Sequence, residues 1–243
     1  MGRPANRQSR SVGNLGDILK HAALVEIAAM LAARGSVRFV DTHAFLLHAA
    51  PSDPERWGRE IDDLVARHPA YARYAALERQ SMARCGHYRC SAGLTLDVLG
   101  DRRAGAVLGE ADGATRAELR EQIAAEDLAD VVVVDDAAIV DRAVAAVAAS
   151  LLVHVDPFSL SLRDWAAIAP ALDAISARPS EAIVFVVYRY SRNARTPWPA
   201  PPRGTSGPVA ETRGGPHELA AYASSAITEQ VRAVCSALGW RAT

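Results

Sequence analysis

Short apolar runs alternate with longer segments of helical periodicity along this chain. Five runs rich in Val, Ile and Leu have the length of a strand: Val37–Asp41, Ala104–Glu110, Asp130–Asp135, Leu151–Asp156 and Ala182–Tyr188. This alternation is typical of repeated βαβ units around a parallel sheet. Four of the five runs end in Asp or Glu. Carboxylates are therefore expected in a row at the carboxyl edge of the sheet, where open α/β sheets bind ligands.

The segments between these runs have the period of amphipathic helices. The first, Asp17–Arg34, is preceded by Asn14 in the position of an N-cap. Further helices are expected around Glu55–Arg67 and Tyr71–Arg84, at about 113–127, 137–148 and 161–177, and from about His217 to Leu238. Residues 51–90 are expected to form a small inserted helical lobe, and the Pro- and Gly-rich residues 191–216 a long loop or lid.

Composition limits the classes of function. A chain of 243 residues, half of them apolar, is expected to form one domain over residues 1–243. Its net charge of −1 gives no general attraction to nucleic acid. The longest apolar run falls short of the roughly 20 residues that span a bilayer. No secretory signal is recognised, so the cytoplasm is the expected location and no membrane partner is expected. The spacing of the three cysteines predicts no metal site.

Three groups of residues at strand ends are not explained by packing of the hydrophobic core alone. They are Asp41-Thr42-His43, Glu110 and Asp156-Pro157-Phe158. Each also has a structural interpretation: a helix cap, a solvated charge and a rigid turn with a core aromatic, respectively. The residues alone leave both interpretations open.

Two motifs carry a resemblance to a known family. Residues 13–21 read Gly-Asn-Leu-Gly-Asp-Ile-Leu-Lys-His, and about 20 residues later Val40–Ala44 reads Val-Asp-Thr-His-Ala. The pair resembles the opening of the bacterial 23S rRNA adenine-N6 methyltransferase family, which carries G-N-x-A-D-V-L-K-H and then D-T-H-A-G-x-G. The resemblance continues at Glu55-Arg56-Trp57-Gly58, at Tyr88–Leu94, at Glu110 and at Asp156-Pro157. It covers roughly residues 10–190.

The resemblance implies a Rossmann-like class I methyltransferase sheet, with parallel strands in the order 3-2-1-4-5, and S-adenosylmethionine as cofactor. It implies that Lys20 and His43 lie near the methionine end of the cofactor with Ser91 nearby, that Glu110 binds the ribose, and that Asp135 or Asp136 approaches the adenine. Asp156 would hold the acceptor nitrogen beside the cofactor. The implied catalytic residues are Asp156, Phe158 and Lys20.

The chain also departs from the family pattern. The glycine-rich turn after D-T-H-A is replaced by Phe45-Leu46-Leu47, and D-P-P-Y by Asp156-Pro157-Phe158-Ser159. The family's C-terminal strand hairpin is expected to be missing. Since these losses concern nucleic-acid handling, the sequence predicts a methyltransferase with a small-molecule acceptor, and RNA is disfavoured as a partner.

Three alternatives stay open. The first is cyclisation of S-adenosylmethionine itself, in which its amine attacks the γ-carbon and methylthioadenosine leaves, as in azetidine-2-carboxylate synthases. The second is the family's adenine-N6 methylation of 23S rRNA, with Phe158 stacking on the base. The third is a non-catalytic scaffold that binds a nucleoside or nothing.

Overall fold

The computed structural model describes residues 12–135, 148–157, 162–177, 181–190 and 198–243. The expected residues Asp136 and Phe158, and the expected helix at 137–148 except for its last residue, lie outside these ranges. Among the described residues, eight strands form one sheet in the order β10-β8-β9-β7-β6-β1-β4-β5. The strands are β1 (Val37–Asp41), β4 (Arg103–Gly109), β5 (Val131–Val134), β6 (Ser150–Val155), β7 (Ala182–Tyr190), β8 (Ala210–Gly214), β9 (His217–Ala223) and β10 (Arg241–Ala242).

The five strands expected from the sequence form the parallel part of this sheet. In chain order they are β1, β4, β5, β6 and β7, and the pairs β5–β4, β4–β1, β1–β6 and β6–β7 are all parallel. Their spatial order is therefore 3-2-1-4-5, as predicted. Because β1 and β6 are adjacent central strands, buried on both faces, their carboxyl ends bring Asp41 and Asp156 to one place.

The expectation of a missing C-terminal hairpin is wrong. β9 pairs antiparallel with β7 on one side and with β8 on the other, so a hairpin completes the sheet. The helix expected from His217 begins only at Thr228, in α8 (Thr228–Ala237), and residues 210–214 of the expected loop are strand β8. The segment His217–Ala223 (HELAAYA) has the composition of a helix, but pairing with two neighbouring strands outweighs this weak local preference.

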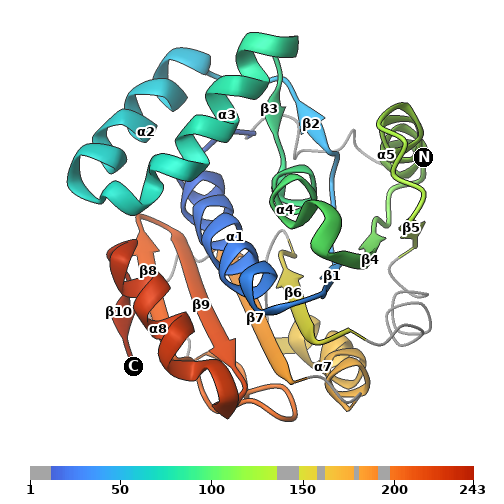
Figure 1. Ribbon diagram of the computed structural model, residues 1–243, viewed down its shortest axis with the longest axis vertical. Helices are drawn as coiled ribbons and strands as arrows, with labels where there is room; N and C mark the ends of the chain where they lie inside the picture. Colours follow the sequence, from blue (N-terminus) through green and yellow to red (C-terminus); the bar gives the residue numbers. More distant parts are fainter. Residues whose placement is uncertain (1–11, 136–147, 158–161, 178–180, 191–197) are drawn as a thin grey trace.

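Helices cover both faces of the sheet (Figure 1). One face packs on α1 (Leu15–Arg34), α4 (Ser91–Leu99), α5 (Gly113–Ala125) and α8, whereas α7 (Leu162–Ser176) covers the other through Trp165, Leu172 and Ile175. α1 begins as predicted beside Asn14, whose side chain accepts hydrogen bonds from the N–H groups of Gly16 and Asp17. α4 was not expected from the sequence.

The inserted segment forms two helices, α2 (Pro54–Arg67) and α3 (Ala72–Cys85), broken at His68-Pro69 as predicted. A short ribbon of β2 (His48–Ala49) and β3 (Tyr88–Arg89) closes it. The buried Arg89 side chain bonds Asp97 on α4 at 2.6 Å and Glu126 after α5 at 2.5 Å, which ties the segment to these two helices. Among the described residues, no helix is both long and apolar enough to cross a membrane.

Candidate functional site

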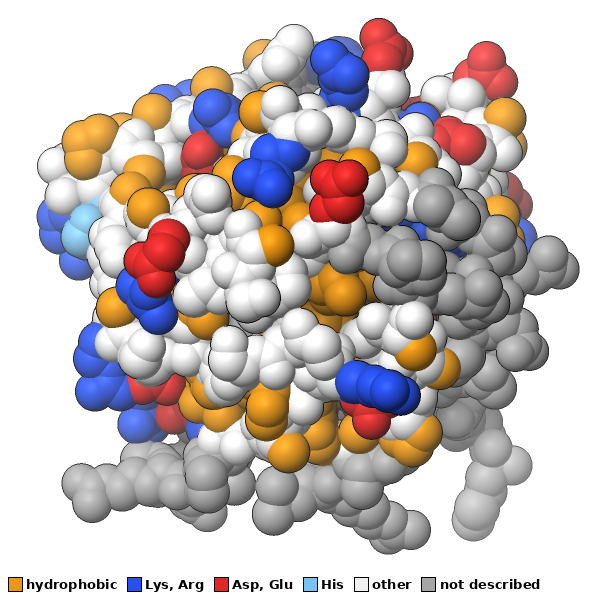
Figure 2. All heavy atoms as spheres, turned by 60° about the horizontal axis from the view of Figure 1, so that its bottom comes forward, with side chains coloured by type: hydrophobic (Ala, Val, Ile, Leu, Met, Phe, Trp, Pro, Cys, Tyr) orange, Lys and Arg blue, Asp and Glu red, His pale blue; other side chains and the backbone are white. Residues whose placement is uncertain are grey.

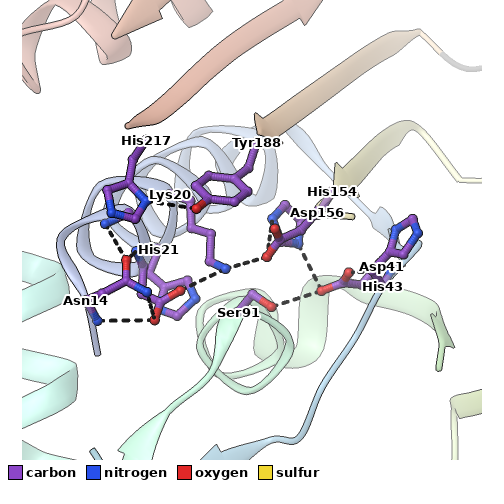
Figure 3. Close-up of polar contacts among 12 residues, drawn as sticks. Asn14, Lys20, His21, Asp41, His43, Ser91, His154, Asp156, Tyr188 and His217 are labelled. Carbon is purple, nitrogen blue, oxygen red and sulfur yellow. Dashed lines mark hydrogen bonds and ion pairs between the residues drawn. The ribbon is translucent and has the colours of Figure 1, made fainter. Parts of the chain in front are cut away.

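A group of buried polar side chains lies at the carboxyl edge of the central strands (Figure 3). α1 ends just before β1 begins, so α1 runs opposite to the strand and its first turn lies at this edge. The group therefore combines the start of α1, the ends of β1 and β6, and the start of α4. Polar groups buried in this way must be paired or serve a ligand.

Lys20 on α1 joins the group through two carboxylates. Its Nζ contacts Asp156 Oδ2 directly and lies 2.9 Å from Asp17 Oδ1. The same Nζ lies 5.1 Å from the centroid of the Tyr188 ring. Burial opposes the charge on Lys20, but Asp156 and Asp17 outweigh this effect and hold the Lys20 pKa well above its ordinary value. Lys20 is therefore an ammonium ion that orients Asp156.

Asp41, fully buried at the end of β1, is the second centre of the group. Its Oδ2 accepts a hydrogen bond from Ser91 Oγ at 3.0 Å and lies 3.0 Å from His154 Nδ1. Its Oδ1 accepts the backbone N–H of His43 at 3.2 Å. Burial favours the neutral acid, but these three partners outweigh it and lower the pKa of Asp41. Asp41 is therefore a carboxylate that orders the site.

The other expected ligand residues lie further along the same edge. Glu110 follows β4 and is 8% exposed, with one oxygen accepting the N–H of Asp112 at 2.7 Å. Burial raises the pKa of Glu110 to about 7. Asp135 follows β5 and is exposed. Since the strand order is β5-β4-β1-β6, the acidic residues Asp135, Glu110, Asp41 and Asp156 follow one another along this edge.

The structure brings together some of the expected site residues and separates others. Lys20 meets Asp156, and Ser91 reaches the same cluster through Asp41. The half-buried His43 bonds Thr42, with 2.7 Å between its Nδ1 and Thr42 Oγ1. Figure 3 shows its ring on the opposite side of Asp41 from Lys20. His43 and Lys20 can therefore contact different parts of a ligand.

Three residues of the site were missed in the sequence. His154 stands inside the apolar run of β6, and alternate strand residues share a face, so its place two residues before Asp156 could have revealed it. Tyr188 and His217 are joined, with 2.8 Å between the hydroxyl and Nδ1. Their pairing depends on β9 lying beside β7, for which the sequence gives no local signal.

The loop after β1 replaces the glycine-rich turn with buried backbone. The N–H of Ala44 bonds the carbonyl of Gly109 at 2.8 Å, and the N–H of Leu47 bonds the side chain of Gln122 at 2.8 Å. The carbonyl of Leu47 accepts the N–H of Cys90 at 2.9 Å. Much of this loop's backbone is therefore hydrogen-bonded to other parts of the protein. Among the described residues, no three or more His, Cys, Asp or Glu side chains are arranged so that they could hold a metal ion.

Comparison with known proteins gives information on the fold. No protein-family model and no curated protein matches the sequence. Among solved structures, protein LPL1258 from Legionella pneumophila, described with the family model DUF519, matches with a TM-score of 0.65 at 13% identity, over 93% of this chain and 92% of that chain. At this identity the likeness concerns the fold alone.

Weaker matches include the putative methyltransferase yhhF from Escherichia coli, with a TM-score of 0.45 at 16% identity over 84% of this chain and 86% of that chain. A SAM-dependent methyltransferase from Aquifex aeolicus has a TM-score of 0.36 at 8% identity over 91% and 93% of the two chains. The topology and the LPL1258 match together establish a Rossmann-like α/β fold for this chain.

Proposed function

We propose that this chain is a methyltransferase that uses S-adenosylmethionine and acts on a small molecule. The observation that carries the proposal is the buried pair of Lys20 and Asp156 beside the Asp41 cluster, at the carboxyl edge of two adjacent parallel strands. Ion pairs removed from water are costly, and other packing would stabilise a fold equally well. Their position at the ligand-binding edge of an open sheet favours a function.

The residues along this edge fit an adenosyl ligand. Glu110 is buried and no basic side chain forms an ion pair with it among the described residues, so desolvation raises its pKa. A carboxylate in this position can accept hydrogen bonds from both ribose hydroxyls, which would compensate for its lost hydration. When bound, S-adenosylmethionine supplies an electrophilic methyl group on a sulfonium. Because the backbone of the loop after β1 is bonded within the protein, contacts to the cofactor that a glycine-rich turn would make fall to side chains such as His43.

The pair of Lys20 and Asp156 suits the acceptor. A carboxylate held at a fixed angle can accept an N–H of the acceptor and aim its nitrogen at the methyl group, and positioning supplies much of the rate for such an in-line displacement. Tyr188 lies beside Lys20 Nζ, and an aromatic face of this kind also tolerates a nearby sulfonium or ammonium.

A small acceptor agrees with the charge of the chain. Lys and Arg total 27 against 28 for Asp and Glu. On the face drawn in Figure 2, acidic and basic side chains stand next to one another rather than gathering by sign. Affinity for RNA rests on many phosphate contacts, and this balance does not favour them.

Product analysis tests the proposal. The purified chain is incubated with S-adenosylmethionine alone and then with a panel of small amines, and products are followed by mass spectrometry. A methylated amine with S-adenosylhomocysteine supports the proposal. Methylthioadenosine with a cyclic amino acid would select the intramolecular reaction instead. If titration with S-adenosylhomocysteine released no heat, the non-catalytic scaffold would be the remaining alternative.

The variant Asp156→Asn adds a residue-level control. It keeps the size of the side chain but removes the charge that pairs with Lys20. Turnover should fall much more than cofactor affinity, because Asp156 is assigned to the acceptor. A loss confined to cofactor affinity would contradict this role.

A further inference from the structure

His154 has an arrangement that the proposed function does not yet use. The imidazole is fully buried on β6. Its Nδ1 lies 3.0 Å from Asp41 Oδ2, and its Nε2 has no hydrogen-bond partner among the described residues. Nε2 lies 4.0 Å from Asp156 Oδ2. A buried polar atom without a partner lowers stability, so its retention at the centre of a site calls for a chemical reason.

The protonation of His154 follows from its partner. Asp41 is ionised, because its lowered pKa keeps it a carboxylate, and a carboxylate only accepts hydrogen bonds. Nδ1 must therefore carry the proton that is shared with Asp41. In the neutral ring, Nε2 then holds a lone pair, and Asp156 Oδ2 lies 4.0 Å from this nitrogen. The same logic operates in Ser-His-Asp triads, where the aspartate fixes the tautomer and stabilises the imidazolium.

The groups around His154 do not compete for this role. Ser91 from α4 donates to Asp41, and Val186 is the apolar neighbour on β7. On α1, Lys20 is paired with Asp156. Burial, together with the nearby charge of Lys20, holds the pKa of His21 well below its ordinary value, so His21 stays neutral. Of the buried ring nitrogen atoms in this group, Nε2 of His154 is the one without a hydrogen-bond partner among the described residues.

We propose that the acceptor is an aliphatic amine that arrives as an ammonium ion, and that His154 is the positioning residue that takes its proton through Asp156. This inference rests on the proposed function. An aliphatic amine is almost fully protonated at pH 7 and has no lone pair for attack. A carboxylate alone is a weak base at that pH, whereas imidazole can hold the proton.

The proton moves in two transfers. An N–H bond of the ammonium breaks as an O–H bond forms on Asp156, and that proton then passes to Nε2, leaving an imidazolium beside the Asp41 carboxylate. The separation of 4.0 Å must shorten when the acceptor binds, as catalytic contacts commonly do. The neutral amine attacks the methyl group, and the N–C bond forms while the electron pair of the breaking C–S bond stays on sulfur. The imidazolium returns its proton to solvent after product leaves.

The tautomer of His154 is measurable without turnover. The full chain, labelled with ¹⁵N-histidine, gives ring signals for its seven histidines, and through-bond correlation to the backbone assigns His154 in the wild type. We expect a proton on Nδ1 and none on Nε2 at neutral pH, with the Nε2 signal moved by Asp156→Asn. A neutral ring protonated on Nε2, or an Nε2 signal indifferent to Asp156→Asn, would overturn the proposal.

Kinetics separate a proton acceptor from a structural residue. His154→Asn keeps a donor toward Asp41 but removes Nε2. With an aliphatic amine, kcat should fall by about 10²-fold or more while KM changes little. With an aromatic amine, which is already neutral, the loss should be small. Val153→Thr, the adjacent buried residue on the other face of β6, is the matched control. Val153→Thr should lower the melting temperature, and any loss of kcat should be the same with the aliphatic and the aromatic amine.

The outcomes distinguish this inference from the proposed function. Equal losses with both amines would remove His154 from the reaction while leaving methyl transfer intact. If no amine of either kind is methylated, the aliphatic amine and the role of His154 are rejected; if S-adenosylhomocysteine also fails to bind, the proposed function fails as well. A proton on Nε2 together with methylated amines would reject His154 alone.

Discussion

At the scale of single residues, carboxylates along one sheet edge differ because their surroundings differ. Asp41 is fully buried, but three hydrogen-bonding partners keep it ionised. The Glu110 side chain accepts the backbone N–H of Asp112, and burial raises its pKa to about 7. Asp41 thus orients its neighbours, whereas Glu110 can accept hydrogen bonds that a ligand donates. Two predictions follow from Glu110.

The first prediction concerns how the free energy of unfolding depends on pH. In the folded chain the Glu110 pKa is about 7, against an ordinary value of 4.5, so the folded state binds this proton more tightly than the unfolded state. Stability is therefore lost as pH rises from about 4.5 to about 7. Glu110→Gln should raise the free energy of unfolding by roughly 1–3 kcal/mol at about pH 8 and change it little at about pH 4. Urea unfolding at both pH values measures this, and an equal effect at both would contradict it.

The second concerns ligand affinity. Glu110→Ala should weaken binding of S-adenosylhomocysteine by about 1–3 kcal/mol, because a charged hydrogen bond to the ribose is lost. The exposed Glu118 on α5 gives a matched control, and Glu118→Ala should leave the dissociation constant unchanged. Calorimetric titration compares the two variants. Equal affinities for wild type and Glu110→Ala would remove Glu110 from the binding site.

At the scale of elements, the site depends on how closely α1 approaches the C-terminal hairpin. A Cβ on Gly16 would lie 2.3 Å from His217 Nδ1, the atom that also lies 2.8 Å from the Tyr188 hydroxyl. Gly214 is similarly close, since its Cβ would lie 2.9 Å from Leu15. Glycine therefore permits β8 and β9 to pack directly on the first turn of α1.

Gly16→Ala tests this packing. Although alanine is the better helix former, the clash with His217 should lower the free energy of unfolding by about 1–3 kcal/mol. Gly58→Ala on α2 is the control, because its Cβ would have no atom within 4 Å, and it should raise stability by about 0.5–1 kcal/mol. Adding His217→Ala to Gly16→Ala should recover part of the loss. Thermal unfolding in which Gly16→Ala matches Gly58→Ala would show that the contact is unimportant.

For the whole molecule, the balance of charge bears on the choice between a small acceptor and RNA. The net charge is −1. Without an excess of Lys and Arg, we expect few counterions to be released on binding to a phosphate backbone, and therefore low affinity at physiological salt. The fold allows either function, so charge and site chemistry must decide between them.

Binding to RNA provides the corresponding test. The chain should show no measurable affinity for a transcript of 23S rRNA at about 150 mM salt, and no methyl label from S-adenosylmethionine should enter deproteinised rRNA. Filter binding and scintillation counting measure the two quantities. Label in adenine-N6 would restore the rRNA alternative and reject a small acceptor.

The sequence by itself determined the parallel part of the sheet. Runs such as Val37–Asp41 and Leu151–Asp156 are bounded by residues that end a strand, and Asn14 caps α1 through bonds to residues two and three positions away. Such signals are local, so they can be read along the chain. They also predicted that Asp41 and Asp156 share an edge, because the carboxyl ends of parallel strands meet there.

The remaining contacts of the site arise from the packing of segments that are distant along the chain. Lys20 meets Asp156 across 136 positions, and His154 meets Asp41 across 113. The segment beginning at His217 became strand β9 because β7 and β8 offered hydrogen bonds on both sides, against its helical composition. Contacts between distant residues depend on which strands become neighbours, and no period in the sequence encodes that choice.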